Sequence, residues 1–129
     1  MQTNDPVSRN LAGQIVPTSW GELNWKITDD AVPGAEMTFG TCRINPGERN
    51  GLHSHPDCEE ILYVVSGRCE HKLGDEMHLL EPGDAIRIPR NVRHWARCLG
   101  SEPLFALIFF SSGKRTAISH EEEGSTFRR

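Results

Sequence analysis

With 129 residues, the chain has the length of a single domain and is large enough to bury a hydrophobic core without cross-links. Hydrophobic residues make up 36% and charged residues 25% of the sequence, and the formal net charge of −4 argues against a protein that binds the nucleic-acid backbone. No apolar run approaches the roughly 20 residues that span a bilayer, and the N-terminus has no basic region followed by an apolar core. We therefore expect a cytoplasmic protein without nucleic-acid or membrane partners.

The sequence contains four cysteines, none of them arranged as a C-x-x-C pair: Cys42, Cys58, Cys69 and Cys98. Cysteines of a chain without a secretory signal usually stay reduced. We therefore expect four free thiols, and neither a disulfide framework nor a zinc finger.

Short segments rich in strand-forming residues follow one another along the chain, separated by turn signals such as Asn45-Pro46-Gly47 and Glu81-Pro82-Gly83. Predicted strands cover residues 11–16, 23–27, 36–44, 61–65, 68–73, 77–80, 85–88, 91–96 and 104–110. The last strand is apolar on both faces and is expected to be fully buried. Because no helical period intervenes, this pattern predicts an all-β sandwich or barrel. The polar residues 111–129 fit either a short helix or a loose tail.

Two histidines and a carboxylate lie close together in the middle of the chain. His53 and His55 are two residues apart, and on an extended strand such residues point to the same face. A proline-containing turn then leads to Glu59-Glu60 and to the buried strand 61–65. Two imidazoles and a carboxylate brought together by a turn make a metal site that is short of one ligand.

The best candidate for the missing ligand is His94. It lies on a predicted strand, after a turn that runs from Gly83 to Pro89, and is distant in sequence from the other three residues. The remaining histidines are expected to be ordinary polar residues: His71, His78 and His120.

These spacings resemble the two sequence motifs of the cupin family. The first motif is matched at every fixed position by Gly47-x5-His53-x-His55-x4-Glu60-x6-Gly67. The second is similar to Gly83-x5-Pro89-x-Asn91-x2-His94.

The second motif departs from the family pattern at two positions. Asn91 stands where the family usually has glycine, and asparagine is the non-glycine residue that best tolerates a left-handed conformation. Cys98 stands where the family usually has asparagine, which puts a structural hydrogen bond in doubt. At four strand residues from His94, or roughly 13 Å at ~3.3 Å per residue, Cys98 is not expected to be a fifth ligand.

The resemblance covers residues 36–110 and implies a double-stranded β-helix, or jelly roll. We expect one domain in which residues 1–35 form a polar segment and leading strands, residues 36–110 the cupin barrel, and residues 111–129 a polar tail. The resemblance also implies one divalent metal per chain, held inside the barrel by His53, His55, Glu60 and His94. Glu59 competes for the carboxylate role, but only Glu60 keeps the six-residue spacing to Gly67.

Three imidazoles and one carboxylate suit Fe, Mn, Ni, Zn or Cu, and the sequence does not choose among them. Four protein ligands on an octahedral ion leave two positions for water or substrate. The resemblance therefore implies a mononuclear metal-dependent enzyme acting on a small oxygenated organic molecule. Dioxygenase-type chemistry is favoured because no inward Tyr, Asp or Lys presents itself as a separate general base. The alternatives are a metal-assisted lyase or isomerase of a small organic or sugar acid, and a non-catalytic cupin that binds metal or a small molecule.

Strand phase suggests which residues line the pocket. If His53 and Glu60 face inward, three further residues do so too: Leu62, Val64 and Ala96. Arg49 has the same parity and could meet an anionic substrate at the mouth, although a solvated surface arginine is the preferred interpretation for a loop residue.

Other apolar residues are expected to face away from the pocket. They include Ile61, Tyr63, Trp95 and part of residues 104–110. Outward apolar residues on sheets predict a homodimer formed by sheet packing.

Overall fold

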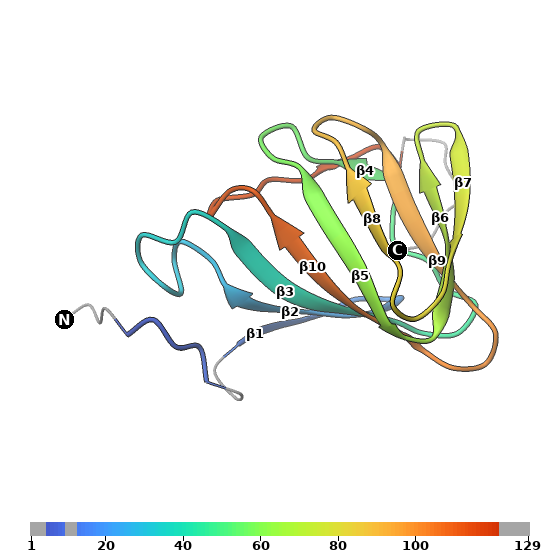
Figure 1. The fold of residues 1–129 in the computed structure, drawn as a ribbon, viewed down its shortest axis with the longest axis horizontal. Coiled ribbons are helices and arrows are strands. Elements are labelled where there is room, and N and C mark those ends of the chain that lie inside the picture. Colours follow the sequence, from blue (N-terminus) through green and yellow to red (C-terminus); the bar gives the residue numbers. More distant parts are fainter. Residues whose placement is uncertain (1–4, 10–12, 122–129) are drawn as a thin grey trace.

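Residues 5–9 and 13–121 are described in a computed structural model, and within them all regular structure is β (Figure 1). Two antiparallel sheets are formed. The six-stranded sheet has the order β1 (Gln14–Pro17), β2 (Gly21–Ile27), β3 (Thr38–Ile44), β10 (Leu104–Phe110), β5 (Glu60–Ser66) and β8 (Ala85–Ile88). The five-stranded sheet has the order β11 (Ile118–Ser119), β4 (His53–Ser54), β9 (His94–Leu99), β6 (Arg68–Leu73) and β7 (Glu76–Leu80).

The predicted all-β jelly roll is confirmed, and each of the nine predicted strands corresponds to an observed one. The first strand was expected from residue 11, but residues 10–12 lie outside the described part of the chain and β1 begins at Gln14. None of the described residues belongs to a helix long and apolar enough to cross a membrane.

Side chains alternate between the space between the sheets and the outer surface. On β5, Leu62 and Val64 are buried, whereas Ile61, Tyr63 and Val65 are exposed. β10 follows the same period, so only every second residue of 104–110 is buried and the others are half-buried. The expectation of a fully buried strand was therefore wrong, because no layer covers the outer face of β10 in the described chain.

The hydrophobic core fills the space between the two sheets. It includes all four cysteines, which are buried free thiols, as expected. Cys69 and Cys98 face each other as register partners on β6 and β9.

Two tight turns fix the positions of the strands that carry the motif residues. Gly67, between β5 and β6, has φ of 76°, and a Cβ there would lie 2.4 Å from the Pro103 carbonyl oxygen. Only glycine fits such a turn without displacing backbone. Asn91 has φ of 70°, the left-handed conformation expected for it, and its backbone N–H donates to the His55 carbonyl at 2.9 Å. This bond joins the turn before β9 to the segment after β4.

Candidate metal centre

The four residues predicted as metal ligands come together between the two sheets. His53 lies on β4, His55 follows it, Glu60 begins β5 and His94 begins β9. His53 and His94 are direct register partners, so the β4–β9 pairing brings the two motifs together. One ligand atom from each of the four residues lies within 4.8 Å of all the others.

Hydrogen bonds fix the orientation of each imidazole ring. Each histidine bonds through Nδ1 to a backbone carbonyl, with the acceptors Gly51 for His53 (2.6 Å), Thr116 for His55 (2.8 Å) and Val92 for His94 (2.9 Å). A carbonyl oxygen can only accept, so Nδ1 carries the hydrogen and the Nε2 atom of the neutral ring presents a lone pair. The backbone therefore directs three Nε2 lone pairs away from the carbonyls.

The lone pairs of the cluster meet without a donor between them. Glu60 Oε1 lies 3.2 Å from His55 Nε2 and 3.3 Å from His94 Nε2. All three atoms are buried and have no hydrogen-bond partner in the described chain. Buried acceptors without donors are costly, and an arrangement of this kind is stabilised only by a cation or a proton placed among them.

The protonation states of the cluster also fit a metal site. Burial, reinforced by the neighbouring His94, lowers the pKa of His53 to about 3, so this ring is neutral at physiological pH. Burial by itself would raise the pKa of Glu60, but a proton held by the His55 or His94 ring and donated to Oε1 keeps this pKa well below its usual range, and a metal ion would take the place of that proton. Neutral imidazoles and an ionised carboxylate are the forms that bind divalent transition metals.

The structure separates the two adjacent glutamates. Glu60 points into the cluster and is 5% exposed. Glu59 points to the surface, where its carboxylate binds Arg87 at 2.6 Å. Cys98 lies outside the cluster, and its thiol donates to the Glu102 carbonyl at 3.2 Å.

Residues 113–121, which we call the C-terminal strap, form neither the helix nor the loose tail considered above. The strap contains β11, which pairs with β4 beside the ligand histidines. Thr116 accepts the Nδ1–H of His55 and also binds both carboxylate oxygens of Asp57. His120 bonds to Ser54 through its ring (2.7 Å) and to Leu52 through its backbone N–H (2.8 Å). Residues 122–129 of the predicted tail lie outside the described residues.

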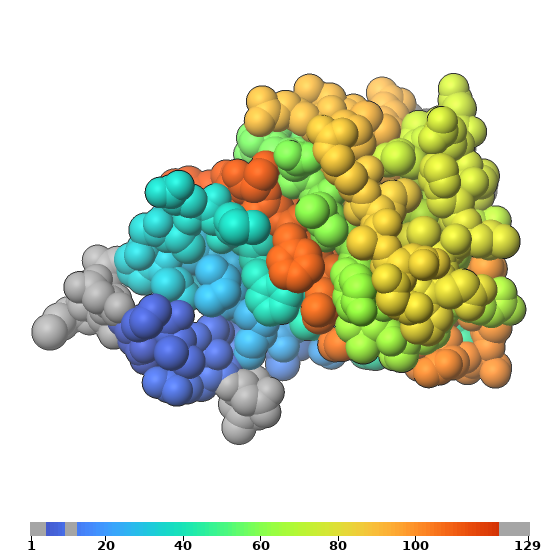
Figure 2. Space-filling model, viewed as in Figure 1, coloured from blue at the N-terminus to red at the C-terminus, as the bar shows by residue number. Residues whose placement is uncertain are grey.

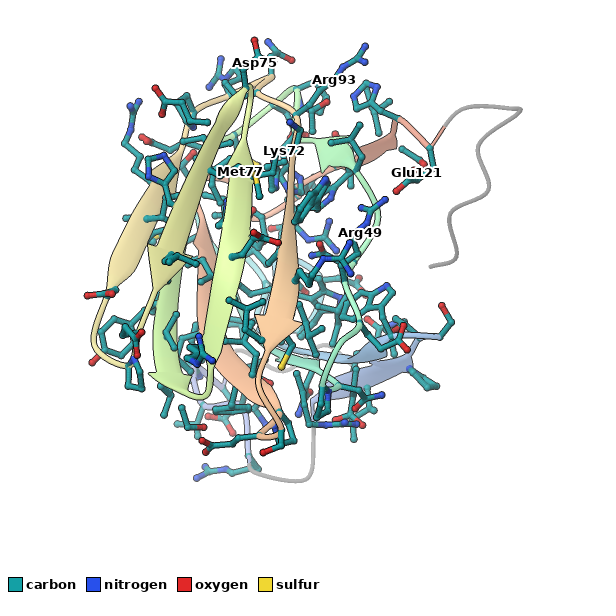
Figure 3. The ribbon with its side chains drawn as sticks, turned by 90° about the vertical axis from the view of Figure 1, so that its right-hand side faces the viewer. Arg49, Lys72, Asp75, Met77, Arg93 and Glu121 are labelled. Carbon is teal, nitrogen blue, oxygen red and sulfur yellow. The ribbon has the colours of Figure 1, made fainter. Side chains whose placement is uncertain are left out.

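A buried ion pair fastens the end of the strap. Glu121 Oε1 lies 2.8 Å from Arg49 Nη2 and also accepts the backbone N–H of Leu52. Figure 3 shows these two labelled side chains approaching each other from separate segments. Arg49 is only 3% exposed, so it is neither the solvated arginine nor the pocket-mouth residue considered from the sequence. Its partner lies 72 residues away in sequence, beyond the reach of strand-parity reasoning.

A cavity of about 520 Å³ lies against the cluster. Its walls come from residues 18–20, β2, β3, β5, β10, the 50–53 segment and the strap. Its larger apolar side chains are Trp20, Leu23, Trp25, Leu52, Leu62, Ile108 and Phe110. Of the predicted pocket residues, Leu62 lines it. Val64 and Ala96 do face inward, but they belong to the packed core and are at most 1% exposed.

Three residues near the site were not predicted to belong to it. Cys42 lines the cavity, and burial raises the pKa of its thiol well above the usual range. Arg115 also lines the cavity, from the strap. His71, expected to be an ordinary polar residue, is 1% exposed and stacks on His94 with ring centroids 5.8 Å apart. The sequence did contain a signal that His71 faces inward, because in strand β6 it alternates with the polar residues Glu70 and Lys72.

A known family model matches more than half of the chain. The family model described as "Cupin domain" matches residues 40–110, a stretch that contains all four cluster residues. The chain belongs to the cupin family. The resemblance noted in the two motifs is thereby confirmed, and so is the double-stranded β-helix, or jelly roll, that it implies.

Two relatives each match a little under two thirds of the chain. Protein SchB of Streptomyces halstedii is 35% identical over 80 residues, which is 62% of this chain. Polyketide synthase CurC of Streptomyces cyaneus is 37% identical over 82 residues, or 64% of this chain. The aligned parts make up only 58% and 53% of those two proteins.

Solved structures share the same barrel. Oxalate decarboxylase from Lactobacillus farciminis, in its formate complex, is similar with a TM-score of 0.79 and 25% identity. That likeness covers 84% of this chain and 34% of the decarboxylase chain.

Proposed function

We propose that this cupin is a mononuclear metal-dependent enzyme that acts on a largely apolar, oxygen-bearing organic molecule. The observation that carries the proposal is the group of buried, donor-free atoms formed by Glu60 and the ligand histidines. His53, His55, Glu60 and His94 would hold one divalent ion of Fe, Mn, Ni, Zn or Cu. Once bound, such an ion supplies Lewis-acid polarisation or, if it is redox-active, oxygen activation.

The lining of the cavity supports an apolar substrate. Trp25, Leu62 and Phe110 line the space beside the cluster with hydrophobic surface. Oxalate and formate, the molecules named for the similar decarboxylase, are small and polar, and would leave most of this hydrophobic surface without contact to the ligand. The relative named a polyketide synthase favours a larger multi-oxygenated carbon skeleton.

For the chemistry, we propose oxygen-dependent turnover as the first reaction to test. Apart from the cluster itself, the titratable side chains that line the cavity in the described chain are Cys42 and Arg115. The raised pKa keeps the Cys42 thiol protonated at neutral pH, and a guanidinium does not accept protons, so neither acts as a general base. In a dioxygenase-type reaction both atoms of O2 enter the product as a carbon–carbon bond breaks, and no separate base is required.

A second candidate is metal-assisted isomerisation or lyase chemistry without O2. It is favoured by the polyketide-associated relative, because multi-carbonyl compounds have acidic C–H bonds that a Lewis acid activates. Glu60 or metal-bound solvent would then have to take the proton, since the rest of the described lining offers no base.

The test begins with metal analysis of protein purified without added metal, for which we expect about one ion per chain. His94→Ala should abolish retention of the metal while circular dichroism still shows the β fold.

Wild-type protein loaded with Fe(II) or Zn(II) would then be offered catechols and 1,3-diketones bearing one or two aromatic rings, with and without air. One O2 consumed per product supports the first chemistry, and turnover that is equal without air supports the second. Absence of bound metal would overturn the proposal, and binding without turnover would leave only the non-catalytic alternative.

We also propose that the chain forms a homodimer through the outer face of the six-stranded sheet. Ile61, Tyr63 and Val65 of β5 are exposed there, beside the half-buried Phe109 of β10, and Figure 2 views this face. Trp95, which was expected to contribute, belongs to the other sheet and contacts Arg side chains instead. Light scattering should give a dimer mass at micromolar concentration and a monomer mass for Tyr63→Arg. A monomer for the wild type would remove this proposal.

A further inference from the structure

Arg115 is a cation on the wall of the cavity. It belongs to the C-terminal strap and directly precedes Thr116, which orients the ligand His55. Its guanidinium carbon lies 3.9 Å from the centroid of the Trp25 ring and 5.3 Å from that of Phe110. Phe110 in turn meets the His55 ring edge-on, with centroids 5.0 Å apart. Only one aromatic ring therefore separates the guanidinium from the metal-ligand cluster.

The guanidinium has aromatic partners but no carboxylate partner within the described residues. No Asp or Glu oxygen of residues 5–9 or 13–121 lies within 4.0 Å of its nitrogens. Arg115 also borders an adjoining polar hollow with Asp29 and Asp30, but Asp29 is paired with Lys114 instead. A guanidinium held over the face of a ring makes no hydrogen bond to that ring, so its N–H groups stay available for a ligand.

The charges around the cavity favour an anion. Glu60 is the only carboxylate among the residues that line it in the described chain, and Arg115 is the only permanent cation. A divalent ion at the cluster would more than neutralise Glu60 and would leave the cavity positively charged. Burial lowers the pKa of Arg115, an effect that the Glu60 carboxylate opposes, so the guanidinium stays charged.

We infer that Arg115 binds an anionic oxygen group of the substrate and thereby selects flat aromatic molecules that carry a carboxylate, enolate or phenolate. This inference rests on the proposed function for the identity of the site, but not on its chemistry. The aromatic part of the ligand would lie between Trp25, Leu62 and Phe110, and its anionic edge would accept N–H bonds from Arg115. Arg115 is in this sense a specificity-determining residue.

The experiment compares 2-naphthoate with the uncharged 2-naphthamide, which has nearly the same shape. Binding to the full-length chain is measured by calorimetry, and by quenching of the cavity tryptophans Trp20 and Trp25, with metal removed by EDTA. Metal removal excludes direct coordination of the carboxylate, so failure of the proposed catalysis would not affect the result. The variants are Arg115→Gln, which removes the charge, Arg115→Lys, which keeps it, and Lys114→Gln, which removes the neighbouring exposed cation.

We expect the wild type to bind 2-naphthoate at least about tenfold more tightly than 2-naphthamide, because only the carboxylate can accept charge-assisted N–H bonds from Arg115. Arg115→Gln should remove this preference and leave the affinity for 2-naphthamide within about threefold. Arg115→Lys should keep part of the preference, and Lys114→Gln should keep all of it. Equal affinities in the wild type, binding of neither probe, or an equal loss for both probes in Arg115→Gln would overturn the inference. The last outcome would mean that Arg115 only holds the strap against Trp25.

Discussion

Replacing Glu60 by glutamine should stabilise the metal-free protein and destabilise the metal-loaded one. In the metal-free cluster, Glu60 Oε1 faces the Nε2 lone pairs of His55 and His94 at 3.2 and 3.3 Å. The amide of Glu60→Gln has nearly the same shape as the carboxylate but carries two N–H donors. Either can point at one of these lone pairs and convert a repulsive contact into a hydrogen bond.

The size of the effect follows from the burial of the three atoms. A buried polar atom left without a partner costs about 1 to 3 kcal/mol, and the substitution pairs at least one Nε2 atom while removing a buried charge. We therefore expect the free energy of unfolding of the metal-free protein to rise by about 1 to 3 kcal/mol, or on the order of 5 to 10 °C in Tm. With zinc at 1,000 times its Kd, the wild type should gain about 4.1 kcal/mol, which exceeds the expected advantage of Glu60→Gln, and Glu60→Gln should gain far less.

The assay is urea unfolding of both proteins, with EDTA and with zinc, at a pH of about 8.5, where unperturbed histidines are neutral. The order of stability should invert between the two conditions. Glu59→Gln is the matched control, because that carboxylate is exposed and its pair with Arg87 should contribute less than about 1 kcal/mol. If Glu60→Gln were destabilising with EDTA as well, the assignment of three inward Nε2 lone pairs would be refuted.

Three further substitutions test how the site is held in place. Gly67→Ala should destabilise by more than about 2 kcal/mol, measured by urea unfolding, because its Cβ would meet the Pro103 carbonyl oxygen at 2.4 Å and its φ is positive. At Asn91, Ala should cost about 1 kcal/mol in the same assay, whereas Gly should change stability by less than about 0.5 kcal/mol, since φ is 70°. Glu121→Gln should lower stability by about 3 kcal/mol, because it removes the charge that faces buried Arg49.

The variants at Gly67 and Glu121 can each be compared with a control substitution elsewhere in the chain. Gly83 also has a positive φ, but a Cβ at this position would have no neighbour within 4 Å, so Gly83→Ala should cost less than Gly67→Ala. Equal losses at the two glycines would assign the effect to backbone conformation alone. A loss at Glu121 no larger than that of the exposed Glu59→Gln would show that the Arg49 pair does not fasten the strap.

The candidate metal-ligand cluster was predictable in part because three of its four residues lie at short spacings in the sequence. His53 and His55 share a face of an extended segment, and the interval from Glu60 to Gly67 equals the length of strand β5 and its turn. The left-handed conformation of Asn91 was also predictable, since few other residues adopt it. For His53, His55, Glu60 and Asn91 a local rule suffices, whereas His94 joins the cluster through the β4–β9 pairing and was predicted from the second motif.

Strand phase did not predict which of the inward-facing residues line the cavity and which belong to the packed core. Parity correctly places Leu62, Val64 and Ala96 on inward faces, but it does not say where along the strand the cavity ends. Leu62 reaches the cavity, whereas the other two lie where side chains from both sheets fill the space. The boundary depends on how the two sheets approach each other, which is a tertiary property.

The conformation of the strap could not be predicted from the sequence for a different reason. It is determined by hydrogen-bond partners that are distant in sequence. Residues 113–121 have no hydrophobic period, and their order comes from bonds to Leu52, Ser54, His55 and Asp57. Thr116 supplies the acceptor that orients a metal ligand, and its neighbour Arg115 supplies the cation of the cavity wall. Consecutive residues thus contact the candidate metal-ligand cluster and line the cavity, so the backbone position of one cannot shift without the other. The ion pair of Glu121 with Arg49 matters to both sites because it fixes the end of that shared segment.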